Sequence, residues 1–361
     1  MEKKRLGDIC EIVTGATPKT NIKEFWDGDI NWITPAELTE DTYIINESLR
    51  KITTEGVEKT GLKSFPKGTV ILSSRAPIGK VAIAGCEMYC NQGFKNLVCS
   101  KQINNRFLYW YLKGHKEYLN SLGRGATFKE ISKAIVENIE ICLPTLEKQE
   151  KYADILEQCN GIIQIKKGQL RKLDTLVKSR FAEMFGDPIR NPKGWKVVTI
   201  GDIVTEVRYG TSKPAVEGGK YPYLRMNNLT ADGHLDLNDL KYIDISDDEV
   251  EKCVVRKGDV LFNRTNSIDL VGKTAVFDLP DDMVIAGYII RVRLNEKILP
   301  EVLSHYMNLE ALKDILRSMA KGAVNQANIN AQELQSIRIY VPDIELQKQF
   351  VEMKDQVDKS K

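Results

Sequence analysis

The chain has 361 residues, of which 42% are hydrophobic and 28% are charged, the balance of an ordinary globular protein with room for two or three domains. The formal net charge of +2 gives no support to nucleic-acid binding, and no apolar run approaches the roughly 18 residues of a membrane span. The seven cysteines follow no disulfide spacing, and no apolar signal region follows the basic start, so we expect a cytoplasmic protein without membrane contact.

The first part of the chain predicts a mixed α/β domain. Short β-rich runs bounded by Gly, Pro or Asn lie at Val70–Leu72, Val81–Ala84, Asn96–Val98 and Glu137–Leu143. Apolar residues recur near helical spacing from Asn105 to Leu122. We therefore place a first domain at residues 1–144.

A different pattern follows Pro144. Apolar residues recur in steps of four and three at Leu156, Cys159, Ile163, Leu170, Leu173, Val177 and Met184, until Gly186 and Pro188 end the run. A period of 3.5 residues is typical of a coiled-coil seam, and about 40 helical residues make a rod of roughly 60 Å. We predict a spacer helix at residues 145–187. A long helix packed along its own domain is the alternative. Gly161 and Gly168 weaken the helix or mark the close approach of a partner helix.

The second half of the chain repeats the first in order. Leu6-Gly-Asp-Ile9 returns as Ile200-Gly-Asp-Ile203, and Phe65–Leu72 returns as Val255–Phe262. The offset drifts from 190 residues, between Phe65 and Val255, to 198 residues, between Pro144 and Pro342. Solenoid repeats are far shorter, at roughly 20 to 50 residues. This pattern indicates a tandem duplication of a whole domain, with the second copy at residues 188–342.

The second copy contains the same kinds of element as the first. Its counterpart helix is predicted at Leu299–Met319. After Pro342 the positions Leu346, Phe350, Met353 and Val357 restart the seam, which predicts a short second spacer helix at residues 343–361. We expect the seam to carry subunit-interface residues, namely Leu156, Ile163, Leu170, Leu173, Val177, Met184, Phe350 and Met353.

The order of these segments resembles the specificity subunits of Type I restriction-modification systems. The resemblance rests on a domain, a long helix ending Arg180-Phe-Ala-Glu-Met-Phe-Gly-Asp187, the phrase Pro192-Lys-Gly-Trp195, and a second domain. It implies a mixed α/β (α+β) fold with two similar target-recognition domains, related by a pseudo-twofold and separated by long coiled-coil-type helices. Each domain would read one half of a bipartite, gapped site in double-stranded DNA. The family normally carries a second helix as long as the first, and residues 343–361 depart from that pattern.

The resemblance also implies partners for this chain. These are two copies of a DNA adenine methyltransferase subunit, which dock on the helices, and a motor-endonuclease subunit. The partner subunits use S-adenosylmethionine, ATP and Mg²⁺, and this chain is expected to use no cofactor.

Candidate DNA-binding residues lie in the predicted loops, because Arg or Lys suits guanine, Asn or Gln suits adenine, and Ser or Thr suits either. In the first domain they are Thr17, Lys19, Thr20, Ser73, Ser74, Arg75, Lys80, Asn91, Gln92, Lys95, Arg124, Thr127 and Lys129. In the second domain they are Thr211, Ser212, Lys213, Arg225, Asn227, Asn228, Asn263, Arg264, Thr265, Asn266, Lys273, Lys321, Asn325, Gln326 and Asn328. The aligned loops at 73–77 and 263–267 differ in their polar residues, as two domains reading different half-sites require. For any single residue the alternative is turn chemistry. The acidic segment 232–251 is expected to face away from DNA.

No catalytic or metal-binding motif stands out. Cys86, Cys90 and Cys99 lack the CxxC spacing of a zinc site, and no phosphate-binding loop or adenine-methyltransferase motif is present. A nuclease-like match at 342–354 places Glu352 and Lys354 on the predicted seam. The sequence therefore favours a non-catalytic DNA-recognition subunit. A stand-alone sequence-specific DNA-binding regulator is the main alternative, followed by a structural coiled-coil protein and an isolated nuclease.

Overall fold

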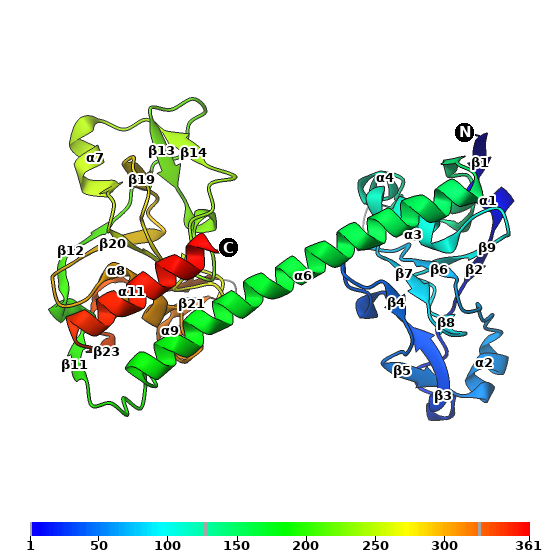
Figure 1. Cartoon of the computed structure of the whole chain (residues 1–361), viewed down its shortest axis with the longest axis horizontal. Coiled ribbons are helices and arrows are strands. Elements are labelled where there is room, and N and C mark those ends of the chain that lie inside the picture. Colours follow the sequence, from blue (N-terminus) through cyan, green and yellow to red (C-terminus); the bar gives the residue numbers. More distant parts are fainter. Residues whose placement is uncertain (1, 126–128, 324–325) are drawn as a thin grey trace. The chain divides into compact units, whose positions relative to one another are not determined.

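The chain folds into two compact units. The computed structural model describes residues 2–125, 129–323 and 326–361, with the backbone alone at 321–323 and 326. Unit 1 spans Met1–Lys166 and unit 2 spans Lys167–Lys361 (Figure 1). The boundary falls inside the 40-residue helix α6 (Leu146–Phe185), so the predicted long helix is confirmed. The domain boundaries placed from the sequence stay predictions.

Unit 1 is built on two sheets. The larger has the order β2 (Cys10–Thr14), β9 (Lys95–Cys99), β6 (Val70–Leu72), β7 (Val81–Ala84) and β4 (Ile44–Ile45), and the smaller has the order β5 (Arg50–Ile52), β3 (Trp26–Ile33) and β8 (Tyr89–Cys90). A separate antiparallel pair joins β1 (Glu2–Arg5) to β10 (Glu140–Leu143). The helical segments are α1 (Leu6–Ile9), η1 (Lys23–Phe25), η2 (Pro35–Glu37), α2 (Thr54–Thr60), α3 (Asn105–Gly114), α4 (Lys116–Ser121) and α5 (Lys133–Glu137).

Unit 2 repeats this architecture. One sheet has the order β12 (Val204–Tyr209), β20 (Ile289–Leu294), β16 (Val260–Asn263) and β18 (Thr274–Val276), and another has the order β14 (Lys241–Ile243), β13 (Tyr221–Leu224), β19 (Met283–Ile285) and β15 (Val254–Val255). A third joins β17 (Thr265–Asn266), β22 (Gln326–Asn328) and β21 (Lys321–Ala323), and β11 (Lys196–Thr199) pairs with β23 (Arg338–Val341). The helical segments are η3 (Ile200–Asp202), η4 (Met226–Asn228), α7 (Asp247–Cys253), α8 (Pro300–Met307), α9 (Glu310–Met319), α10 (Ala331–Ser336) and α11 (Ile344–Lys359).

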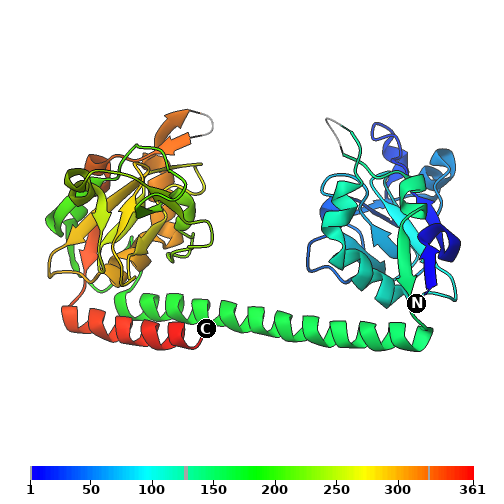
Figure 2. The ribbon, with the colours of Figure 1, turned by 90° about the horizontal axis from the view of Figure 1, so that it is seen from above.

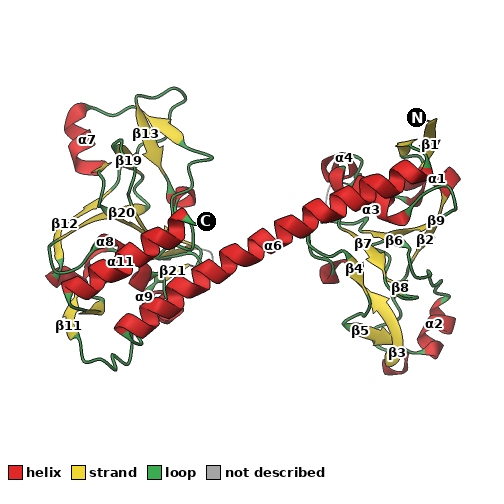
Figure 3. Ribbon diagram, in the orientation of Figure 1, coloured by secondary structure: helices red, strands yellow, loops and turns green. Residues whose placement is uncertain are grey.

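The two units share one topology. The order β2-β9-β6-β7 matches β12-β20-β16-β18, antiparallel throughout. In the smaller sheets β3 is antiparallel to β5 and parallel to β8, just as β13 is antiparallel to β14 and parallel to β19. This agreement confirms the predicted duplication of a mixed α/β domain, and Figure 3 shows the helices and strands of each copy.

Two helical predictions need correction. The segment predicted as one helix from Asn105 to Leu122 forms α3 and α4, because His115 ends the first helix and begins the second. Likewise the segment Leu299–Met319 forms α8 and α9, separated at Asn308 and Leu309. Apolar spacing persists across both breaks because the two helices of each pair contribute to one hydrophobic core. The spacing alone does not reveal a local break in the backbone.

In unit 2, α11 packs antiparallel along the C-terminal part of α6 (Figure 2). Phe350 is fully buried, with its ring 5.2 Å from Phe181 and 5.5 Å from Phe185, and the Lys361 ammonium lies 2.8 Å from the Asp174 carboxylate. The predicted subunit-interface residues Val177, Met184 and Phe350 are therefore corrected. They form the core of unit 2, because α11 covers that part of the seam, while Leu173 and Met353 pack partly buried against it.

The remainder of the predicted seam is uncovered. Leu156, Ile163 and Leu170 are 42%, 52% and 39% exposed, and Tyr152 lies on the same line at 40%. We call these four residues the α6 stripe. It continues the register that α11 covers further along the helix. None of the described helices combines the length and the apolar character of a transmembrane segment.

Candidate nucleic-acid interface

In each unit, segments far apart in the sequence meet at the end of one central strand. In unit 1 the residues after β6 meet the segment around Glu130, since the amide of Ile131 donates to the carbonyl of Ser74 at 2.9 Å. In unit 2 the amide of Ile329 donates to the carbonyl of Arg264, also at 2.9 Å. The hairpin β21–β22 projects from unit 2 on the side away from α6 and α11 (Figure 2). These two matching places carry many of the candidate polar residues.

An ionic cluster occupies this place in unit 1. The Arg75 Nε donates to Glu130 Oε2 at 2.9 Å, and the buried Lys95 Nζ lies 3.2 Å from Glu130 Oε1 and 3.1 Å from Ser74 Oγ. Burial raises the pKa of the Glu130 carboxyl, but the hydrogen bonds and charges of Arg75 and Lys95 outweigh it, so this pKa lies below its usual value. Glu130 is therefore an ionised acceptor beside an exposed guanidinium.

A neutral pair occupies the same place in unit 2. The Thr265 hydroxyl donates to Asn328 Oδ1 at 2.8 Å, within the β17–β22 ladder. Beside it the Arg264 guanidinium lies 4.9 Å from the centre of the Tyr209 ring and donates to the Gly287 carbonyl. The attraction between a cation and the face of an aromatic ring favours this position of the guanidinium. The scaffold is shared between the units and the functional groups are different.

Two candidate lysines have a structural role instead. Lys80 Nζ donates to the carbonyls of Pro35 and Leu38, and its ammonium group thereby caps the end of η2. Lys273 is buried and its ammonium donates to the carbonyls of Met226 and Leu229, at the equivalent end of η4. Both are corrected, because these ammonium groups are engaged inside their own unit.

Several further candidates are corrected because their side chains are buried. Ser73 donates to the Pro77 carbonyl, and Asn263 donates to the carbonyls of Thr265 and Tyr288. Asn228 donates to the Asp236 carbonyl. Direct contact with DNA is excluded at these positions by burial, which is also the case for Ser74, Lys95 and Thr265 within the polar clusters described above. Polar side chains in loops commonly satisfy the backbone of the loop itself.

Two basic candidates pair with the acidic segment 232–251. Arg225 contacts the Asp239 carboxylate at 2.7 Å, and the Lys213 ammonium lies 2.6 Å from Glu249. Both side chains are accessible, at 29% exposed for Arg225 and 50% for Lys213, so their contact with DNA stays a prediction.

The other candidates remain accessible. Those with exposed side chains are Thr17, Lys19, Thr20, Arg75, Gln92, Arg124, Lys129, Ser212 and Asn227, and those half-buried are Asn91, Thr211, Arg264, Asn266 and Asn328. Their contact with DNA stays a prediction. Thr127 and Asn325 lie outside the described residues, as do the side chains of Lys321 and Gln326.

Two residues of the interface were missed by the sequence reading. Glu130 is not among the candidates named from the sequence, although it precedes Asn328 by 198 residues, the offset that relates Pro144 to Pro342. Tyr209 is also absent from those candidates, and in the structure it ends β12 with its ring beside Arg264. Aligning the two copies position by position would have pointed to Glu130.

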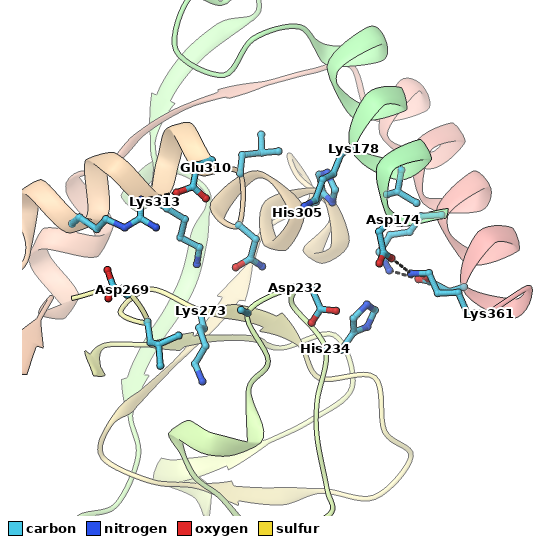
Figure 4. A pocket seen from close by; sticks show the side chains of 18 residues that line it. Asp174, Lys178, Asp232, His234, Asp269, Lys273, His305, Glu310, Lys313 and Lys361 are labelled. Carbon is cyan, nitrogen blue, oxygen red and sulfur yellow. Dashed lines mark hydrogen bonds and ion pairs between the residues drawn. The ribbon is translucent and has the colours of Figure 1, made fainter. Parts of the chain in front are cut away.

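A cavity of about 330 Å³ in unit 2 lies apart from this interface (Figure 4). Most of its charged groups are satisfied within the chain, since Lys361 bridges Asp174 and Asp358, and Lys313 donates to the Gly272 carbonyl. Lys354, part of the nuclease-like match, contacts Asp358 at 2.6 Å. All seven cysteines have free thiols, and over the part of the chain that is described no three His, Cys, Asp or Glu side chains gather as metal ligands would.

Comparison with known proteins gives consistent similarities. The family model of the Type I restriction modification DNA specificity domain matches residues 1–175 and 192–361. The MjaIX specificity subunit of a Type I restriction enzyme from Methanocaldococcus jannaschii is 38% identical over 248 residues, which cover 63% of this chain and 57% of that relative. The EcoKI specificity subunit of Escherichia coli is 24% identical over 322 residues, covering 83% of this chain and 69% of that relative.

A solved structure shares the fold. The crystal structure of a Type-I restriction-modification system S subunit from M. genitalium aligns with a TM-score of 0.55 at 14% identity, covering 99% of this chain and 89% of that one. This likeness supports the architecture described above.

Proposed function

Because the chain belongs to the family defined by the Type I restriction modification DNA specificity domain, we propose that it recognises a bipartite, gapped sequence in double-stranded DNA. Each unit would read one half-site. Adenine methylation and cleavage would be carried out by partner subunits, so the chain itself would hold no cofactor, while the partners would use S-adenosylmethionine, ATP and Mg²⁺.

One observation carries this proposal. Two units of one topology present different polar groups at the same place, with Arg75 and Glu130 in unit 1 and Thr265 and Asn328 in unit 2. Sequence is read by side chains that match the donors and acceptors of base edges. A duplicated scaffold with altered polar groups is what the recognition of two different half-sites requires.

The α6 stripe supports a docking role for the helix. Exposed apolar residues that continue a covered seam usually mark a protein interface. We propose that the stripe receives the methyltransferase subunit, present in two copies per complex, and that a motor-endonuclease subunit joins for restriction.

The test is to purify the full chain with the modification subunit of the same host, and to map methylated adenines in host genomes with and without the chain. We expect co-elution and methylation at a single gapped sequence that disappears without the chain. A genome whose methylated adenines are unchanged by its removal would overturn the proposal. Sequence-selective DNA binding without any association would indicate the stand-alone regulator instead.

A matched pair of variants tests the docking surface. Ile163 and Ile165 are both exposed on α6, at 52% and 63%, but they point to different sides of the helix because two residues turn it by about 200°. We expect Ile163→Lys to abolish co-elution and Ile165→Lys to leave it unchanged. Equal effects of the two substitutions would remove the stripe from the docking surface.

A further inference from the structure

The place where Arg75 and Glu130 meet in unit 1 has the same backbone pairing as the place where Thr265 and Asn328 meet in unit 2. Arg75 pairs with Glu130 in an isolated antiparallel bridge, and Thr265 pairs with Asn328 in the β17–β22 ladder. The third strand is also matched, since Arg124 pairs with Glu130 as Lys321 pairs with Asn328. The two side-chain pairs therefore occupy one structural position.

The surroundings of the two pairs differ in charge. Beneath Glu130 in unit 1 lies the buried Lys95, whose ammonium is 3.2 Å away. The ladders place Ile290 of unit 2 at the position of Lys95, since Lys95 pairs with Thr14 and Ile290 pairs with Tyr209 at the ends of β2 and β12. Ile290 is buried and apolar. The Glu130 carboxylate therefore has the cation Lys95 beside it. At the equivalent position in unit 2, the neutral amide of Asn328 has the apolar residue Ile290.

The free hydrogen-bonding groups of the pairs match different base pairs. Arg75 uses its Nε toward Glu130, which leaves both terminal nitrogens as a fork of donors beside a carboxylate acceptor. A guanine·cytosine pair offers the O6 and N7 acceptors of guanine next to the N4 donor of cytosine in the major groove. Asn328 receives the Thr265 hydroxyl on Oδ1, which fixes the amide and leaves an acceptor lone pair and an NH₂ donor. Adenine offers the complementary N7 acceptor and N6 donor.

We propose that this position selects the base pair in each half-site. Arg75 and Glu130 would read a G·C pair, and Asn328, whose amide is held by the buried Thr265, would read an A·T pair. The inference rests on the proposed function and names the specificity-determining residues within it. Side-chain exposures of 46% for Arg75 and 34% for Glu130 leave the pair accessible, so recognition needs no rearrangement of the unit.

The test uses the full chain and a library of randomised DNA duplexes, from which bound sequences are selected and read. The key variants are nearly isosteric with the residues they replace. Asn328→Asp replaces the NH₂ donor by an acceptor, and Glu130→Gln does the reverse. Asn238→Asp, on an exposed loop of unit 2, is the control that adds the same charge elsewhere.

We expect Asn328→Asp to lower the preference for adenine about tenfold or more at one position of one half-site, with the other half-site unchanged. Glu130→Gln should alter one position of the other half-site, and Asn238→Asp should alter none. Unchanged selection by both variants, or an equal loss of affinity for every duplex, would overturn the inference. If the unaltered chain selects no sequence, the proposed function itself is wrong, which separates the two failures.

Discussion

Gln149 in unit 1 and Gln347 in unit 2 make the same three hydrogen bonds. The Oε1 atom of Gln149 accepts from the Asn104 amide at 2.8 Å, and its Nε2 donates to the carbonyls of Gln102 and Pro144 at 3.1 and 2.9 Å. Gln347 accepts from the Leu299 amide at 2.8 Å and donates to the carbonyls of Lys297 and Pro342 at 3.0 and 2.8 Å. Both side chains are fully buried. The duplicated segment therefore includes the anchor that fixes each spacer helix to its unit.

Replacing this anchor should destabilise unit 1. We expect Gln149→Ala to lower the free energy of unfolding by about 2 kcal/mol or more, because it leaves a buried amide and two carbonyls without partners. Gln158→Ala, at an exposed position of the same helix, is the control and should change stability by less than about 0.5 kcal/mol. Urea denaturation of both variants provides the measurement, and equal stabilities would show that the anchor contributes nothing.

The packing of α11 on α6 should depend on the aromatic ring of Phe350. Phe350 is fully buried against Phe181 and Phe185, so Phe350→Ala should cost about 3–5 kcal/mol through lost burial and the cavity left behind. Thermal unfolding should show an early transition for unit 2, with unit 1 unaffected. Lys348→Ala, on the exposed side of α11, is the matched control. A single unshifted transition for Phe350→Ala would contradict this account of the core.

The extent of agreement with the sequence follows from the physics of each feature. The long helix was predictable because its apolar period persists through Met184. The duplication was predictable because Gly and Pro residues that fix turns recur in the same order in both copies. The sequence did not predict which part of the seam is covered. The burial of Val177 and Met184 depends on where α11 lies in space. Lys80 and Lys273 carry charges that suit DNA, yet tertiary contacts direct them to backbone carbonyls.

Stability of unit 2 should fall in mild acid because of His305. Burial, and then the nearby ammonium groups of Lys354 and Lys178, lower the pKa of His305 to about 4 from an ordinary value near 6.5. Between pH 6.5 and pH 4 the unfolded chain therefore binds a proton that the folded chain excludes, so stability decreases as the pH falls through this window. The effect is at most about 3 kcal/mol.

The control for this titration is His305→Gln, which cannot take up the proton. The difference in unfolding free energy between the unaltered chain and this variant should shrink from pH 7.5 to pH 4.5. Denaturation curves at the two pH values give the answer. A difference that stays constant with pH would show that His305 is protonated equally in both states.

Gly161 and Gly168 of α6 should be replaceable by alanine with a gain in stability. A Cβ atom at either position would meet nothing within 4 Å, and each glycine costs a helix interior up to about 1 kcal/mol relative to alanine.

The two glycines lie on the opposite side of the helix from Ile163 and Leu170, because residues two positions apart differ by about 200° in direction. If the α6 stripe is the docking surface, the double variant should be more stable and still co-elute with the modification subunit. Gly15→Ala is the contrasting change, since its Cβ would lie 1.8 Å from the Cys90 carbonyl oxygen and should destabilise unit 1. A double variant that is more stable but no longer associates would place the partner against the glycine side of α6 and move the interface away from the stripe.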